Sequence, residues 1–288
     1  MSLVETRFSF CLCADDFALS PGVSRGILEA VGAGRLSAVS VMTTRPAWPE
    51  GAQSLLPFTA KADIGLHLNL TLGKPLGDMP SFAASGRLPE IRQVVKAARQ
   101  RSLPDAEIAD EISRQLDRFC KHFGAPPAFV DGHQHVHILP QIRSSLFRCL
   151  EQRGLAGKLW LRTSSDHPSR ILRRGVEVAK ALAVAWLARG FTREAAARGF
   201  STNEGFAGFS AFNPAQDYAT DFARYLRAPG RRHLIMCHPG YCDEELVAVD
   251  PVTLSREREL SFLLSPAFTD MFQREGARLT PLSTGLIY

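Results

Sequence analysis

Short apolar segments of strand length alternate along the chain with longer segments of helical period. The apolar segments span residues 7–13, 37–42, 64–70, 128–137, 158–162, 233–237 and 278–282. In 64–70, Ile64, Leu66 and Leu68 alternate with small or polar residues, which is the period of two that a strand requires. We predict a strand at each of these places.

Helical segments fill most of the intervals between the strands. Proline after a serine predicts a helix start at Pro21, and apolar residues recur every three or four positions over 105–123. Further helices are predicted from Pro140 and over 256–272. The regular alternation of strand and helix favours parallel β/α units.

About seven or eight such strands predict an α/β fold, a distorted (β/α) barrel of mostly parallel strands that is TIM-barrel-like. The alternative is an open doubly wound sheet, but the first βα turn, residues 14–20, carries no glycine fingerprint. We expect a single domain over 1–288. Within it, the polar insertion 74–102, rich in Pro and Gly at its start, is expected to form a lid or rim over the site.

Composition narrows the class of protein. The net charge is +5, but the basic residues are scattered over predicted helices without interleaved aromatics, so we expect no nucleic-acid partner. No apolar stretch is long enough to span a bilayer, and no secretion signal is apparent. The six cysteines form no CxxC pair, which favours free thiols and a cytoplasmic location.

Two adjacent carboxylates, Asp15 and Asp16, follow the first apolar segment, at the edge where a β/α barrel carries its catalytic residues. They could instead cap the following helix, although Ser20 lies closer to its start. His67 lies on the polar side of the strand at 64–70, near its end. On its own, it could equally be an interior histidine without a ligand role.

The segment 131–137, Asp-Gly-His-Gln-His-Val-His, is the strongest chemical signal. If the strand continues, Asp131, His133, His135 and His137 share one face, where a metal site with supporting histidines would explain them. The alternative is a strand end that frays into a polar loop. Because one segment cannot supply a complete set of ligands, Asp16 and His67 are the candidates to complete it.

His238 ends the strand at 233–237, at the same predicted edge of the barrel. A histidine there is suited to protonate a leaving amine, although a turn histidine before Pro239 and Gly240 is the alternative. The sequence contains neither a G-x-S-x-G nucleophile elbow nor a phosphate-binding loop.

Four motifs in order resemble the YdjC-like carbohydrate deacetylases, a family that includes chitooligosaccharide and hopanoid-associated deacetylases. They are ADDFALSPGV from Ala14, GLHLNLT from Gly65, DGHQHVH from Asp131 and MCHPGY from Met236. The chain departs from the family at Ala18, where Gly is frequent, and at Gly132-His-Gln134, where Ser-His-His is frequent.

The resemblance implies one divalent metal ion, Mg²⁺ or Zn²⁺, held by Asp16, His67 and His133, with Asp15 as the general base. It implies a hydrolase that removes the acetyl group from an N-acetylated amino sugar, an oligosaccharide or a lipid-linked sugar, in which His238 is our candidate proton donor. Residues expected to support these ligands or to meet the substrate are Asn69, Asp131, His135, His137 and Arg256. Glu259 matches a family segment that borders the site.

Two rival classes stay open at this stage: a metal-dependent hydrolase of another bond, such as a phosphoester, and a non-catalytic sugar-binding barrel. Residues 170–200 carry a possible apolar helical stripe, formed by Ile171, Val178, Leu182 and Trp186. It is expected to face the core as an ordinary barrel helix, with peripheral membrane contact as the alternative if the substrate is lipid-linked. The sequence leaves a homodimer open.

Overall fold

The computed structural model describes residues 6–285, and its centre is one sheet of nine parallel strands. Eight of them follow the order β6-β5-β4-β3-β2-β1-β8-β7, and β9 pairs with the start of β1. The strands are β1 Phe8–Phe17, β2 Ala38–Val41, β3 Asp63–Leu68, β4 Phe129–Gly132, β5 Trp160–Leu161, β6 Ser201–Thr202, β7 Phe206–Ala207, β8 His233–Cys237 and β9 Ala277–Leu279. The predicted α/β distorted barrel is therefore confirmed.

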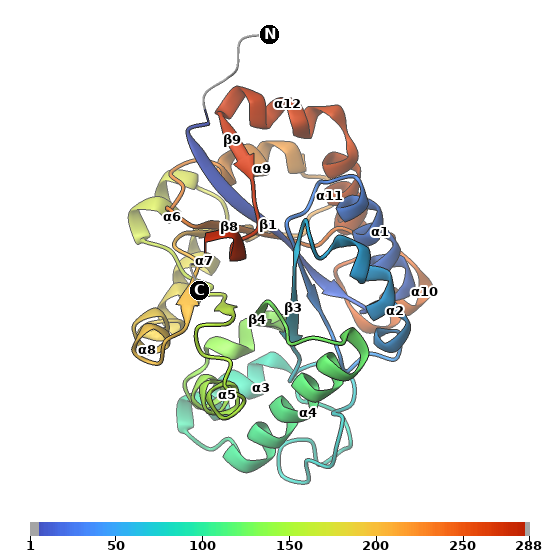
Figure 1. The fold of residues 1–288 in the computed structure, drawn as a ribbon, viewed down its shortest axis with the longest axis vertical. Coiled ribbons are helices and arrows are strands. Elements are labelled where there is room, and N and C mark those ends of the chain that lie inside the picture. The colour runs from blue at the N-terminus through green and yellow to red at the C-terminus, as the bar shows by residue number, and fades with distance from the viewer. Residues whose placement is uncertain (1–5, 286–288) are drawn as a thin grey trace.

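Helices surround the curled sheet, as Figure 1 shows. They are α1 Pro21–Gly32, α2 Trp48–Leu55, α3 Ile91–Gln100, α4 Asp105–Phe123, α5 Pro140–Gln152, α6 Pro168–Arg174, α7 Val178–Leu187, α8 Phe191–Ala197, α9 Tyr218–Tyr225, α10 Glu244–Val249, α11 Leu254–Leu264 and α12 Pro266–Glu275. Short 3₁₀ turns are η1 Leu56–Phe58, η2 His133–Ile138 and η3 Ser283–Gly285. The predicted helix start at Pro21 is confirmed, and Ser20 accepts a hydrogen bond from the Val23 amide as its cap.

The barrel stays open between β6 and β7, the two ends of the strand order. Asn203, in the short loop between them, fixes this loop to the chain that follows β5. Its Oδ1 accepts from the Thr163 amide at 2.7 Å, and its Nδ2 donates to the carbonyls of Thr163 and Gly205, each at 3.0 Å. Gly205 has a φ of 101°, a conformation that favours glycine, and an added Cβ would meet the Gly230 backbone at 2.8 Å.

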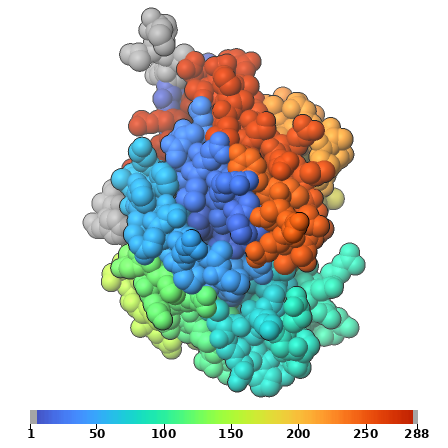
Figure 2. Space-filling view, turned by 90° about the vertical axis from the view of Figure 1, so that its right-hand side faces the viewer, coloured from blue at the N-terminus to red at the C-terminus, as the bar shows by residue number. Residues whose placement is uncertain are grey.

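The first strand lies beside the last two strands, because β1 pairs with both β8 and β9. Figure 2 shows the amino-terminal segments in blue lying beside the carboxy-terminal segments in orange and red. The close approach is possible because Gly26 of α1 faces Gly240, where a Cβ would lie 2.7 Å from the Gly240 Cα. This contact fixes the loop after β8 against α1.

The predicted strand 128–137 is wrong in its second half. β4 ends at Gly132, and the chain turns into η2 at His133. Gln134 and His135 have φ values of 51° and 61°, in the left-handed region, where a strand cannot continue. The alternating histidines therefore do not share one face of a strand.

Two helical predictions also need correction. The helix predicted over 256–272 is two helices, because Pro266 cannot continue α11 and Ser265 adopts an extended conformation. The segment 170–200 forms three short helices, α6, α7 and α8, in place of one continuous stripe. Within the described residues, no helix combines the length and the apolar character that crossing a bilayer demands.

Candidate metal centre and active site

Three side chains that are far apart in the sequence meet at one end of the barrel. Asp16 lies near the end of β1, His67 near the end of β3, and His133 directly after β4. His67 Nε2 lies 3.3 Å and His133 Nδ1 3.0 Å from Asp16 Oδ1, and one ligand atom of each residue lies within 4.8 Å of the other two. All three residues are buried. The structure thus brings the predicted ligands together.

The backbone of β1 explains why Asp15 and Asp16 point in different directions. The register of β1 against β2 shifts between Ala14 and Phe17, and Asp16 has a φ of 71°. Such a bulge redirects a side chain, at a conformational cost that concentrates at functional sites. Ala18 also has a φ of 71°, which is a physical reason for a glycine at this position in related sequences.

A buried carboxylate fixes the orientation of His67. Its Nδ1 lies 2.7 Å from Asp131 Oδ1 and 3.1 Å from Ser40 Oγ. With the Nδ1 hydrogen donated to Asp131, loss of the Nε2 proton would leave a lone pair on the side of Asp16 for a cation to bind. Although burial lowers the pKa of His67, Asp131 and Asp16 together raise it to about 10, so cation binding there would release a proton.

The second oxygen of Asp16 is held by Arg256 of α11. Arg256 Nη2 lies 2.7 Å from Asp16 Oδ2 and 2.8 Å from Asp250 Oδ2. Burial acts to raise the pKa of Asp16, but Arg256 and His133 outweigh it and hold the pKa well below its usual range. Asp16 is therefore ionised and keeps Oδ1 facing the two imidazoles.

Asp15 is clamped by a residue that the sequence analysis missed. Arg162, directly after β5, donates to Asp15 through both Nη1 and Nη2 at 2.6 Å. The same Nη2 lies 2.6 Å from Asp131 Oδ2. Arg162 thus connects the candidate base Asp15 to the carboxylate that orients His67. Its position at the end of a predicted strand was the one signal that could have identified it.

The donor set of the three ligands suits a divalent cation. Two imidazole nitrogens and one carboxylate oxygen converge in a buried site, and the ligands are themselves oriented by Asp131 and Arg256. A second group within the described residues, Cys13, Asp15 and Asp131, has similar spacing, but Arg162 already places its guanidinium against both carboxylates. A metal ion there would have to displace this buried charge.

His238 lies across the cavity and is fixed through its backbone. Its amide donates to Glu259 Oε2 at 2.6 Å, and its ring packs edge-on against Phe212 at 5.2 Å between centroids. Its buried Nδ1 has no protein partner among the described residues. Burial lowers the pKa of His238 to about 4, against the opposing effect of Asp15 and Asp16. The ring is therefore neutral at pH 7.

The other two histidines of 131–137 have separate positions. His135 lines the cavity, with Nδ1 3.0 Å from Ser164 Oγ and its ring against Phe209. His137 is fully buried, and its Nε2 lies 2.8 Å from the Arg162 carbonyl oxygen. Burial lowers the pKa of His137 to about 4. His137 therefore supports the backbone that carries Arg162.

The side chain of Asn69 makes its hydrogen bonds to the loop that follows it and to Thr44. Its Oδ1 accepts from the amides of Thr71 and Leu72, and its Nδ2 donates to Thr44 Oγ1 and the Leu72 carbonyl. The side chain is fully buried. The structure therefore does not bring Asn69 to the cavity.

A cavity of about 360 Å³ opens above the three ligands. Its lining combines the polar site with an apolar wall from four elements or loops, formed by Ile91, Val184, Phe212 and Met236. Ile91 comes from α3 of the predicted lid or rim, and Val184 and Lys180 come from α7. Asp15, Asp16, His67, His133, His135, His238, Asp250 and Arg256 also line it.

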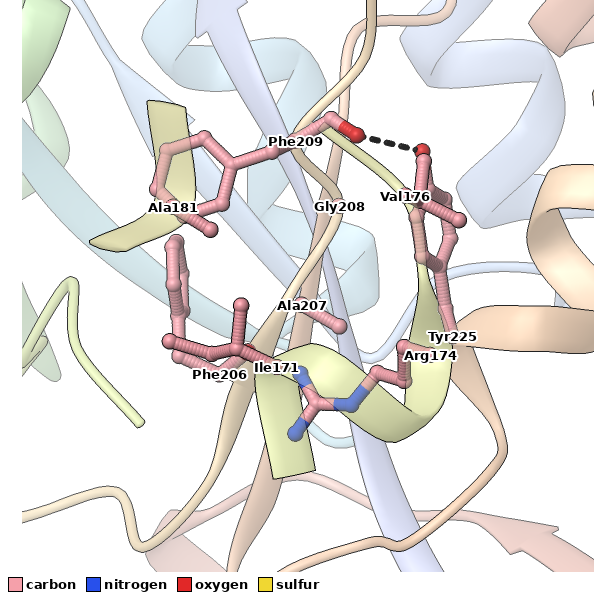
Figure 3. Close-up of a pocket in the computed structure, with 9 residues that line it drawn as sticks. All are labelled: Ile171, Arg174, Val176, Ala181, Phe206, Ala207, Gly208, Phe209 and Tyr225. Atoms are coloured by element: carbon pink, nitrogen blue, oxygen red, sulfur yellow. Dashed lines mark hydrogen bonds between the residues drawn. The ribbon is translucent and has the colours of Figure 1, made fainter. Parts of the chain in front are cut away.

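A second pocket, shown in Figure 3, lies between α6, α7 and β7. It is apolar apart from Arg174, and Tyr225 closes one side by donating a hydrogen bond to the Phe209 carbonyl at 2.8 Å. Its volume of about 10 Å³ has room for no more than a water molecule. It is a packing gap between these helices and β7, not a substrate site.

Comparisons with known proteins find relatives that match over most of this chain. Two relatives, from Salmonella typhimurium and Salmonella paratyphi B, are named chitooligosaccharide deacetylase. Each is 29% identical over 272 residues, which are 92% of this chain and 94% of the relative.

Solved structures share the fold. An Enterococcus faecalis protein, provisionally named for cellobiose-phosphate cleavage, has a TM-score of 0.73 at 20% identity, over 97% of this chain and 99% of its own. A peptidoglycan N-acetylglucosamine deacetylase has a TM-score of 0.52 at 10% identity, over 97% and 88%. The sequence profile of the YdjC-like protein family matches residues 9–274. The chain belongs to the YdjC-like protein family.

Proposed function

We propose that this protein is a metal-dependent carbohydrate N-deacetylase, which hydrolyses the acetamide of an N-acetylated amino sugar to the free amine and acetate. The observation that carries the proposal is the convergence of Asp16, His67 and His133 beside Asp15, at the floor of a cavity large enough for a sugar ring. The names of the relatives and the family membership support it.

Asp16, His67 and His133 would hold one divalent cation. When bound, the cation supplies Lewis acidity toward the attacking water and the acetyl carbonyl. The nitrogen-rich donor set suits Zn²⁺, and Mg²⁺ is the alternative that the family resemblance brings. Metal analysis of protein purified without added metal distinguishes the two.

Asp15 is the proposed general base. Arg162 holds both of its oxygens, so the carboxylate keeps one orientation toward the cavity while the water oxygen attacks the carbonyl carbon. Asp15 takes the proton that the water loses. His238, neutral in the resting site, would take up a proton from solvent and donate it to the amine nitrogen as the C–N bond breaks. Asp15 then returns the proton of the water to solvent, which restores the resting site.

The charge arrangement weighs against a two-metal phosphoester hydrolase. Such a site needs a second set of ligands a few ångströms away, and the only neighbouring carboxylate set within residues 6–285 already encloses Arg162. A non-catalytic sugar-binding barrel is disfavoured too. Burying Asp15, Asp131 and Arg162 together costs solvation energy that a binding function does not require.

Acetate release from diacetylchitobiose, with and without a chelator, tests the proposal. We expect release only with metal. Asp15→Asn should retain the metal and lose most of its turnover, whereas His133→Ala should lose the metal itself. Unchanged acetate release by a chelator-treated His133→Ala protein would disprove the mechanism.

Four further features stay predictions. They are a single domain over 1–288, a lid or rim role for 74–102, a cytoplasmic location, and a homodimer. The six cysteines, all within the described residues, are free thiols, which fits a reducing compartment. Sedimentation of the purified protein measures the oligomeric state, and deletion of 74–102 tests the lid.

A further inference from the structure

α7, beside the mouth of the cavity, lies at the surface although its only charged residue is Lys180. Nine of its ten residues are Val, Ala, Leu or Trp, and within it only Ala181 is buried. Ala179, Ala183 and Trp186 recur at helical spacing on its exposed side, and Trp186 is 53% exposed. A surface helix normally places several polar residues there, whereas α7 has only Lys180, so its exposed side is suited to a partner with an apolar part.

A basic stripe lies next to this apolar face. Arg92, Lys96 and Arg99 recur at helical spacing on the exposed side of α3, and neither α3 nor α7 contains an acidic residue. The two helices meet at Trp186, whose ring centroid lies 5.7 Å from the Arg99 guanidinium and 5.4 Å from that of Arg189. We call these six residues of α3 and α7 the rim surface: Arg92, Lys96, Arg99, Ala179, Ala183 and Trp186.

We propose that the rim surface binds the face of an anionic lipid bilayer. An exposed apolar helix, a tryptophan and adjacent basic side chains are the features that hold a peripheral protein at the boundary between headgroups and acyl chains. α7 would insert Trp186 shallowly, and α3 would meet the lipid phosphates. Since Ile91 and Val184 of the same helices line the cavity, the bound protein would hold its cavity mouth near the membrane.

A second copy of the chain fits this surface less well. A twofold contact brings the same patch of both copies together, and here it would gather three basic residues from each copy without an acidic partner on either helix. Anionic phosphates supply the complementary charge. The proposal is independent of the deacetylase activity, because it needs neither the metal ligands nor the base.

The fluorescence of Trp186 can be used to test membrane binding. Of its three tryptophans, Trp48 and Trp160 are fully buried, so changes in fluorescence on adding vesicles report on Trp186. We expect a blue shift and vesicle flotation with phosphatidylcholine vesicles that contain phosphatidylglycerol, and neither with phosphatidylcholine alone. Roughly 0.5 M salt should weaken the binding, because it screens the basic stripe.

Two variants separate the apolar and basic contributions. Trp186→Glu should abolish flotation. The triple variant R92Q/K96Q/R99Q should weaken it roughly tenfold or more, because each basic residue contributes to attraction by an anionic surface. In both, acetate release from soluble diacetylchitobiose should stay at the wild-type level.

Matched controls change equivalent residues elsewhere. Val247→Glu alters a valine that is 63% exposed on α10, and K121Q/K158Q/R278Q removes the same net charge from other surfaces. Both controls, and the metal-ligand variant His133→Ala, should bind vesicles like the wild type. No blue shift with anionic vesicles, equal loss in the controls, or self-association that buries Trp186 without lipid would overturn the proposal.

Discussion

At the scale of single residues, the site depends on charged side chains that hold one another in place. Arg162 bridges Asp15 and Asp131, and Asp131 orients His67. These pairs are buried, so each charge relies on its partner for the solvation that water would otherwise give. We therefore expect the proposed role of Asp15 as a base to depend on the shape of its partner as well as on its charge.

Arg162→Lys tests this dependence on shape. Lysine keeps the charge but cannot donate to both oxygens of Asp15 in a planar fork. We expect kcat to fall by about 10- to 100-fold, with the metal content unchanged. Steady-state kinetics and metal analysis of the same preparation check it. A kcat equal to that of the wild type would show that the fork geometry is unimportant.

Buried His233 gives a pH-dependent contribution to stability. Burial lowers its pKa to about 4, from an unfolded value near 6.5, so the unfolded chain binds a proton that the folded chain does not between these values. Stability is thus lost as the pH falls from about 6.5 toward 4. His233→Gln removes this titration. Its loss of unfolding free energy between pH 7.5 and pH 5 should be smaller than that of the wild type by about 2 kcal/mol.

Urea unfolding at the two pH values measures the difference. Because Nε2 of His233 donates to the Tyr225 carbonyl, the glutamine amide can replace that hydrogen bond and keep the fold. Parallel pH dependence in the two proteins would contradict the assignment of a neutral buried His233.

At the scale of elements, α11 connects two strand ends to each other. Arg256 and Glu259 lie on one side of this helix, where Arg256 holds Asp16 of β1 and Glu259 accepts the amide of His238 after β8. The helix therefore sets the position of a candidate metal ligand and of the candidate proton donor. The sequence analysis named Arg256 among the residues expected to support the ligands or to meet the substrate, but it gave Glu259 no specific contact.

Glu259 is the residue whose substitution separates these two roles. Glu259→Leu leaves the buried His238 amide without an acceptor, at a cost of about 1–3 kcal/mol, and should lower kcat without changing metal affinity. Glu259→Gln keeps an acceptor oxygen and should stay close to the wild type. Isothermal titration with Zn²⁺ and acetate release measure the two effects. Equal kinetics for the Leu and Gln variants would contradict the positioning role.

The sequence predicted element types better than element ends. The boundaries of α4 and β8 were predicted correctly, because both have strong apolar periodicity between clear turn signals. The strand at 128–137 was overextended, since nothing local signals the left-handed conformations of Gln134 and His135. Arg162 was missed because its contacts form only in the folded barrel. There β5 pairs with β4, and Asp15 of β1 lies within ion-pair distance of Arg162.

At the scale of the whole molecule, side-chain bonds fix the chain at the edge of the barrel opening. Asn203, directly after β6, makes two hydrogen bonds to the backbone of Thr163 after β5 and one to the Gly205 carbonyl before β7. The parallel arrangement followed from the sequence, whereas the count of about seven or eight strands fell short of the nine observed because β6 and β7 were not predicted. The opening was not predicted either, because two-residue strands such as β6 and β7 leave no readable period.

Asn203→Ala should destabilise the fold by about 1–3 kcal/mol, because buried backbone groups lose their partners. The midpoint of urea unfolding measures the change. Asn213→Ala is the matched control, since Asn213 accepts only from a nearby amide in an exposed turn, and its midpoint should stay near that of the wild type. Equal midpoints for both variants would contradict the role of Asn203 at the barrel opening.

The most direct test of the central claim is anomalous diffraction from crystals of the protein grown with Zn²⁺ or Mn²⁺. We predict one anomalous peak within bonding distance of Asp16, His67 and His133, and its loss in His133→Ala. A peak between Asp15 and Asp131 that displaces Arg162, or no peak among the three proposed ligands, would contradict the account.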